Sequence, residues 1–149
     1  MIVYLDTSSL VKLYVEEDGS DEVRQLLGDA EAVATSAVAY PEARAAFARL
    51  SRERHLTPAA HRRIKAALDA DWPRYVVVHV TDAVCLRAGE LAERRALRGF
   101  DAVHLASYLA LVESADVDLA FSSFDRSLAR AATAERRRLR SSRRDRSRR

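Results

Sequence analysis

Short apolar runs recur along the chain, separated by longer stretches with helical periodicity. Each run is rich in β-branched or aromatic residues and is bounded by polar positions, which is the pattern of a buried strand. The four runs are IVYL (2–5), AVATS (32–36), YVVVHV (75–80) and VDLAF (117–121). We therefore expect a sheet of about four to five short strands.

Helical patterns fill the intervals between these runs. Thr57 followed by Pro58 is a favourable N-cap and first-turn pair. The segment DAVHLASYLALVE (101–113) is polar at few positions, so we expect a helix that is buried on most sides. The expected helices cover 8–17, 20–28, 41–54, 58–71, 82–98, 101–113 and a segment that begins near residue 124.

The alternation of strands and helices indicates the fold class. No tight hairpin signal such as Asn-Gly joins two strands, so the connections are expected to be right-handed crossovers between parallel strands. This predicts a three-layer α/β/α domain with a central parallel sheet.

Composition fits one soluble domain. The chain has 149 residues, of which 48% are hydrophobic and 32% charged, and no apolar run approaches the length of a membrane span. We expect a cytoplasmic protein. The single cysteine, Cys85, excludes an internal disulfide and is expected to be a small core residue.

The charge is distributed unevenly. Residues 136–149 hold nine of the 25 Lys and Arg residues and one of the 22 acids, a net charge of +8, which leaves residues 1–135 at −5. We therefore expect one domain over 1–135 and an Arg-rich tail over 136–149. A disordered, solvated tail is the favoured interpretation. An arm that binds RNA phosphates and an altered reading frame that replaced the original end are the alternatives.

Four acids fall where the carboxyl ends of parallel strands are expected to meet, which is where ligands bind in such sheets. Asp6 follows the first strand and Asp125 follows the fourth, while Glu42 and Asp101 open helices. Taken singly, Asp6, Asp101 and Asp125 are possible N-caps, and Glu42 is a first-turn acid favoured by the helix dipole.

Four carboxylates at one sheet edge would repel one another unless a cation neutralised them. Oxygen ligands without His or Cys favour Mg²⁺ or Mn²⁺, and such ions suit the hydrolysis of phosphodiesters. The chain contains neither the GxxxxGK[ST] phosphate loop nor the GxSxG nucleophile elbow. If the four acids bind a cation, Asp6 is better interpreted as a metal ligand than as an N-cap. We then expect Thr7 or Ser8 to be the N-cap of the helix that follows.

Four segments, each carrying one of these acids, resemble in order the signature regions of PIN domains, with the toxins of VapBC toxin–antitoxin pairs as the nearest match. They are DTSSLVKLY, TSAVAYPEARAAF, FDAVHLASYLAL and SSFDRSLARAA. The resemblance covers residues 2 to about 132. It implies a Mg²⁺- or Mn²⁺-dependent endoribonuclease with catalytic, metal-binding acids at Asp6, Glu42, Asp101 and Asp125. It also implies an RNA substrate, a cognate antitoxin and a homodimer.

Nearby polar residues are further candidates. Thr7, Ser8 and Ser123 are expected to hydrogen-bond carboxylates, metal-bound waters or a substrate phosphate. His104, one turn after Asp101, is either a general acid or a packed, hydrogen-bonded core residue. The arginines 44, 49, 52 and 54 are candidates for an approach groove.

The end of the chain departs from the family pattern. No glycine turn and no closing strand follow SLARAATAE (127–135). The alternative function is therefore a PIN-like binding module with lost or reduced activity that mainly binds an antitoxin or oligomerises.

Overall fold

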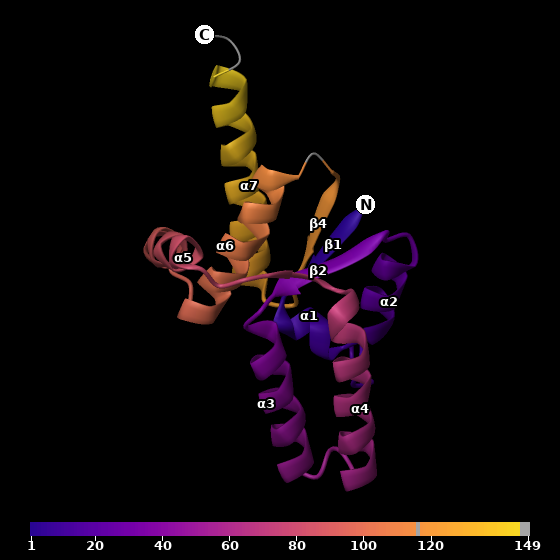
Figure 1. Ribbon diagram of the computed structural model, residues 1–149. Helices are drawn as coiled ribbons and strands as arrows, with labels where there is room; N and C mark the ends of the chain where they lie inside the picture. Colours follow the sequence, from indigo (N-terminus) through magenta and orange to yellow (C-terminus); the bar gives the residue numbers. More distant parts are fainter. Residues whose placement is uncertain (116, 147–149) are drawn as a thin grey trace.

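A parallel sheet lies at the centre of the computed structural model, which describes residues 1–115 and 117–146 (Figure 1). Its strands have the order β3-β2-β1-β4, and all three pairings are parallel. This arrangement confirms the expected fold class. The bounds are β1 Ile2–Leu5, β2 Ala32–Ser36, β3 Val76–Val78 and β4 Leu119–Ser122.

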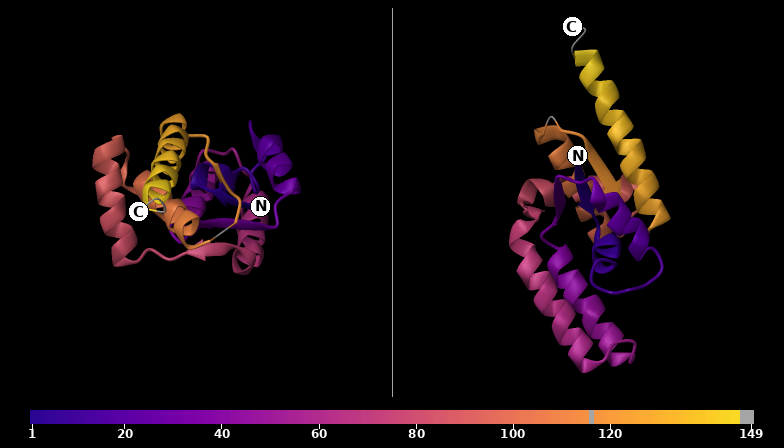
Figure 2. Two further views of the ribbon diagram at one scale, coloured as in Figure 1. Left: turned by 90° about the horizontal axis from the view of Figure 1, so that it is seen from above. Right: turned by 90° about the vertical axis from the view of Figure 1, so that its right-hand side faces the viewer.

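Helices cover both faces of the sheet and so complete the three layers (Figures 1 and 2). The alternation of side chains along β1 divides the core, because Tyr4 packs in one cluster while Val3 and Leu5 pack in the other. The Tyr4 cluster includes α5 Asp82–Arg95, α6 Gly99–Ser114 and α7 Arg126–Arg146. The Val3 cluster includes α1 Thr7–Val11, α2 Ser20–Gly28, α3 Ala39–Arg52 and α4 Pro58–Asp71, and the 3₁₀ turn η1 Trp72–Arg74 follows α4.

The first helix is shorter than its pattern indicates. It ends at Val11 rather than near residue 17, and the chain turns before α2 begins at Ser20. The turn is fixed by the Ser20 hydroxyl, which donates to the Val15 carbonyl at 3.1 Å and accepts from the Glu17 amide at 3.0 Å. Gly19 has a φ of 90°, a conformation that disfavours other residues.

The structure confirms the prediction of a buried helix and contradicts the prediction of a buried cysteine. Helix α6 is buried along most of its length, as expected, with Leu105, Tyr108 and Leu109 in the core. Cys85, expected in the core, is exposed. The buried stripe of α5 runs through Val84 and Ala88, and Cys85 lies beside that stripe rather than on it.

The arginine-rich end also differs from the expectation, because α7 continues without a break from Arg126 to Arg146. No boundary of the structure falls at 135. Buried Glu135 accepts from Arg94 and Arg95 of α5, and Arg136 donates to the Leu119 carbonyl of β4 at 2.6 Å. These contacts anchor the middle of α7. Beyond them the helix projects from the body, while residues 147–149 of the expected tail lie outside the described residues (Figure 1).

Two further observations concern what the fold lacks. Among residues 1–115 and 117–146 no strand follows β4, which leaves β4 at one edge of the sheet. No helix within those residues combines the length and the hydropathy that a transmembrane segment requires.

Candidate active site

The four acids singled out in the sequence line one hollow of about 940 Å³ at the carboxyl edge of the sheet. Asp6 directly follows β1, and Asp125 follows β4, its neighbour in the sheet. Glu42 lies in the first turn of α3, and Asp101 in the first turn of α6. Each acid therefore sits where a strand ends or a helix begins, and the parallel topology brings these points together.

Asp6 is the most enclosed of the four, with 3% of its surface exposed. The Ser8 hydroxyl lies 2.7 Å and 2.9 Å from its two carboxylate oxygens, and the Ser123 hydroxyl donates to Oδ2 at 2.5 Å. The Ser9 amide donates to Oδ1 at 2.9 Å, so Asp6 is the N-cap of α1. The expectation that Thr7 or Ser8 would replace Asp6 as the cap is wrong. The carboxylate outcompetes the hydroxyls because it follows the strand directly and its oxygens reach the third amide.

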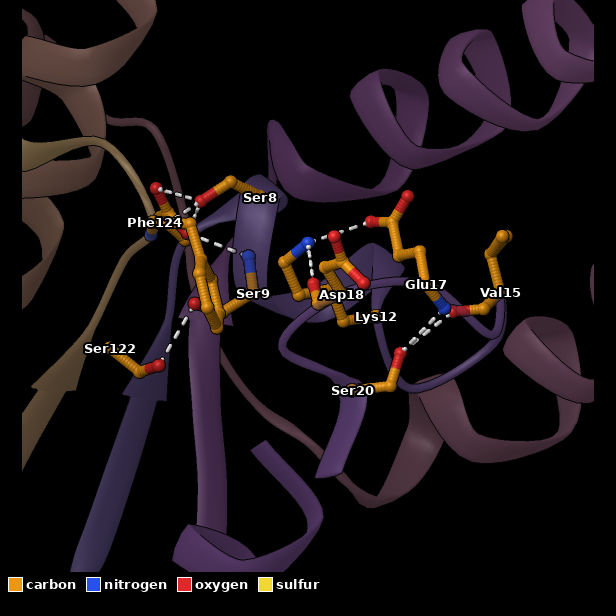
Figure 3. A network of polar contacts seen from close by, with 10 residues as sticks. Ser8, Ser9, Lys12, Val15, Glu17, Asp18, Ser20, Ser122 and Phe124 are labelled. Carbon is orange, nitrogen blue, oxygen red and sulfur yellow. Dashed lines mark hydrogen bonds and ion pairs between the residues drawn. The ribbon is translucent and has the colours of Figure 1, made fainter. Parts of the chain in front are cut away.

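Ser8 also ties the loop after β4 to α1. Its hydroxyl accepts from the Phe124 amide at 3.0 Å, while the Ser9 and Ser122 hydroxyls lie 2.9 Å apart (Figure 3). The ammonium of Lys12 stands 4.5 Å from the centre of the Phe124 ring. These contacts fix the segment that carries Ser123 and Asp125 against the start of α1.

Glu42 belongs to a chain of hydrogen bonds that reaches the core. Thr7 donates its hydroxyl proton to Glu42 Oε1 at 2.6 Å, and His104 Nε2 lies 2.9 Å from the same oxygen. His104 is 2% exposed, and its Nδ1 lies 3.1 Å from the hydroxyl of buried Tyr4. Burial of Glu42 opposes its ionisation, but the hydrogen bonds from His104 and Thr7 bring its pKa below the usual value.

The protons of this chain follow from the donors available. Thr7 has one proton and gives it to Glu42, so its oxygen, 3.0 Å from His104 Nε2, accepts there. Nε2 therefore carries a proton, and we assign the Tyr4 hydroxyl as the donor to Nδ1. Burial raises the pKa of Tyr4 well above its usual value, which keeps the phenol protonated. His104 is thus a packed, hydrogen-bonded residue, the second of its two expected roles, and it also lines the hollow.

Asp101 and Asp125 complete the acidic edge. Burial, followed by the charges of Asp125 and Asp6, raises the pKa of Asp101 above its usual value. Asp125 caps α7, because its Oδ1 accepts from the Leu128 amide at 2.9 Å. The Asp125 amide in turn donates to the Ser123 hydroxyl at 3.0 Å. The repulsion acting on Asp101 marks this edge as a place where a cation would be stabilised.

The donor set fits a hard divalent cation. All four acids offer carboxylate oxygens, the ligands that Mg²⁺ and Mn²⁺ prefer. Within the part of the chain that the structure describes, no three His, Cys, Asp or Glu side chains lie close enough to form a closed ligand cluster.

Some residues of the hollow were not expected from the sequence. Arg98, Phe100 and Val103 line it from α6 and its start, opposite Cys85 of α5. Phe100 is 59% exposed. Of the four arginines proposed for an approach groove, Arg49 lines the hollow, together with the acids.

The other three arginines of that set lie elsewhere. Arg44 donates to the Tyr40 hydroxyl at 2.6 Å and pairs with Asp69, while Arg52 and Arg54 are exposed near the α3–α4 turn.

A comparison with protein families decides the relationship. The model of the PIN domain family matches residues 3–134, nearly all of the folded chain. The chain belongs to the PIN-domain family. This PIN domain is similar to Ribonuclease VapC45 and Ribonuclease VapC49 of two strains of Mycobacterium tuberculosis. Each is 39% identical over 127 residues, which cover 85% of this chain and 86% of the relative.

Among solved structures, the PIN domain resembles a chain in the crystal structure of VapBC2 from Rickettsia felis bound to a DNA fragment from their promoter. The TM-score is 0.54 at 15% identity, and the match covers 83% of this PIN domain and all of that chain. At that identity the likeness supports the fold, in agreement with the sheet order and layers described above.

Proposed function

We propose that this PIN domain is a metal-dependent endoribonuclease that acts as the toxin of a VapBC-type toxin–antitoxin pair. The observation that carries the proposal is the position of Asp6, Glu42, Asp101 and Asp125 around one hollow. The similarity to two proteins named as VapC ribonucleases supports the substrate class. A cytoplasmic location and a homodimer are part of the same proposal and follow the family expectation.

The acids of the hollow have different roles in the proposed reaction. Bound Mg²⁺ or Mn²⁺ would supply a water of lowered pKa and would offset charge on the phosphate. Asp6, held by Ser8 and Ser123, and Asp101, whose negative charge is disfavoured without a cation, are the proposed first ligands. Glu42 lines the hollow, and its hydrogen bonds with Thr7 and His104 both use Oε1, so Oε2 is the proposed ligand atom.

The remaining residues have supporting roles in the proposal. Asp125, exposed at the start of α7, is placed to hold a metal-bound water or a second ion. Ser123 and Ser8 orient Asp6, while Thr7 and His104 orient Glu42. Because Asp6 and Glu42 accept hydrogen bonds from residues on other elements, these two carboxylates are oriented before substrate arrives.

The test is cleavage of a structured RNA with Mn²⁺, compared with the same reaction in EDTA. We expect Asp6→Asn and Asp101→Asn each to abolish cleavage while the fold is retained, since Asn remains a good N-cap at position 6. Asp29→Asn changes an exposed aspartate outside the hollow and is the matched control. Cleavage at the wild-type rate by either site variant, or cleavage that persists in EDTA, would refute the proposal.

The antitoxin is tested separately. The product of the gene beside this one, when it is co-purified with the full chain, should suppress cleavage in proportion to its occupancy. A neighbouring product that binds without changing cleavage would contradict the toxin role and leave the nuclease assignment standing.

A further inference from the structure

Helix α7 connects the acidic edge of the sheet with a region far from it. The helix begins one residue after Asp125, at the carboxyl end of β4. At the amino end of β4, Arg136 donates to the Leu119 carbonyl and lies 3.5 Å from the Asp118 carboxylate. From there α7 continues beyond the body of the molecule (Figures 1 and 2). One rigid element therefore leads from the proposed catalytic acids to the projecting end of the chain.

The arginines of α7 are not spread evenly around the helix. At 100° per residue, five of them fall within an arc of about 80°. These are the arginine stripe: Arg126, Arg130, Arg137, Arg140 and Arg144, all exposed. Buried Leu128 and Glu135 and part-buried Leu139 lie on the opposite side of the helix. The stripe extends over 18 residue steps, about 27 Å along the helix axis.

The arginine stripe makes no ion pair within the described part of the chain. None of its guanidinium groups forms an ion pair with a described side chain, whereas Arg94, Arg95 and Arg136 all do. Like charges one turn apart weaken a helix, so helix formation does not account for this arrangement. An external chain of negative charges would offset the repulsion.

Between the stripe and the sheet lies a hollow of about 430 Å³. Arg137 and Arg140 line it together with Arg136 and with Phe121 of β4, which is half-buried. Arginine presents a planar fork that matches phosphate, and the exposed part of the Phe121 ring suits contact with a base or a sugar. Arginine beside aromatic surface is the combination found where proteins follow a single strand of nucleic acid.

We infer that the arginine stripe is a track for the phosphate backbone of a single-stranded RNA segment that extends from the catalytic hollow. This inference rests on the proposed ribonuclease function and deepens it, because it places substrate contacts up to about 27 Å from the catalytic acids. The track binds phosphates without reading sequence, so it raises affinity for long substrates and contributes nothing for short ones.

The test uses the full chain and a triple variant, Arg137→Gln, Arg140→Gln and Arg144→Gln. Glutamine keeps a high helix propensity, and the change leaves Arg126, beside Asp125, untouched. The control variant, Arg62→Gln, Arg63→Gln and Arg138→Gln, removes the same charge from exposed positions off the stripe. Binding of an oligouridylate of about 20 nucleotides is measured in EDTA over a range of salt concentrations.

Each phosphate contact on a single strand contributes about −0.7 to the slope of log K against log [salt]. We expect the stripe variant to lose about 2 from the magnitude of that slope, and its affinity deficit to shrink more than about tenfold between 50 and 200 mM salt. The control variant should keep the wild-type slope. Equal slopes for both variants, or an unchanged slope for the stripe variant, would overturn the inference.

Two further arms separate the possible causes. Oligothymidylate of the same length tests whether the track takes DNA, and binding of DNA in clear preference to RNA would contradict a substrate track. Mn²⁺-dependent cleavage of a tetranucleotide, too short to reach Arg137, should proceed equally in the wild type and the stripe variant. If no RNA is cleaved at all, the proposed function fails, while the binding slopes still decide on the track.

Discussion

Removal of the buried Tyr4 hydroxyl tests how much its hydrogen bond with His104 contributes to stability and to the proposed site. In Tyr4→Phe the ring volume is kept, but His104 Nδ1 loses its donor at a position that is 2% exposed. Leaving a buried acceptor unsatisfied costs about 1–3 kcal/mol. For a domain of this size each kcal/mol corresponds to about 2–4 °C in melting temperature. We therefore expect Tyr4→Phe to melt about 2–12 °C below the wild type.

The measurement is thermal and urea unfolding, with Tyr40→Phe as the matched control. Tyr40 makes two hydrogen bonds of 2.6 Å, to Asp69 and from Arg44, but at the surface, where water replaces them. Its loss should change the free energy of unfolding by less than about 0.5 kcal/mol. Equal effects of the two substitutions would refute the reasoning that the Tyr4 hydroxyl satisfies a buried acceptor.

The same variant reports on the site. Without the Tyr4 donor, the proton assigned to His104 Nε2 is free to move to Nδ1, and Nε2 then no longer donates to Glu42. We expect the ¹⁵N shifts of the His104 ring to move toward the other tautomer and kcat to fall by up to about a hundredfold with little change in KM. Unchanged ring shifts together with a lower kcat would show that Tyr4 acts otherwise than through His104.

Further predictions concern the acids themselves. Saturating Mn²⁺, at about 100 times its Kd, should stabilise the wild type by about 2.7 kcal/mol, and Asp101→Asn should remove most of this gain in a thermal-shift assay. Asp125→Ala should lower the free energy of unfolding by about 1 kcal/mol, because the Leu128 amide loses its capping acceptor. Asp125→Asn should keep this cap, so a loss of cleavage in the Asp125→Asn variant would report on the lost charge alone. Because the folded-state pKa of Glu42 lies below its usual value, its ionisation stabilises the fold above the unfolded pKa. In EDTA, the free energy of unfolding of the wild type should therefore exceed that of Glu42→Gln most near neutral pH, and this difference should decline as the pH falls through the folded-state pKa of Glu42. A difference that does not change with pH would contradict the lowered pKa of Glu42.

The sheet and most helices were predictable because their signals are local. β-branched runs bounded by polar residues located four strands, and Thr57-Pro58 located the start of α4. The end of α1 was not predictable, because it depends on hydrogen bonds of Ser20 to residues of the preceding turn rather than on the apolar pattern. The exposure of Cys85 was not predictable either. Cys85 lies one residue beyond Val84 on α5, and this single step places its side chain outside the buried stripe.

The acids of the site were predictable as a group, and their individual bonding was not. Topology brings strand ends together whatever the side chains, so Asp6, Glu42, Asp101 and Asp125 share a hollow as expected. The hydrogen bond between Tyr4 and His104 was not predictable, because a tyrosine in an apolar strand has the pattern of an ordinary core residue. Only the approach of His104, 100 positions away in the sequence, gives its hydroxyl a partner near the site.

The cap and the ligand roles of Asp6, which the sequence set against each other, are compatible in the structure. Cap formation uses Oδ1 through the Ser9 amide, and Ser8 and Ser123 supply donors that any approaching cation would compete with or rearrange. The amide of Ser9 and the hydroxyls of Ser8 and Ser123 together fix the direction in which the Asp6 carboxylate points. A carboxylate that is buried, oriented and in one hollow with three other acids is suited to binding a cation. The cap therefore prepares Asp6 for the proposed ligand role instead of replacing it.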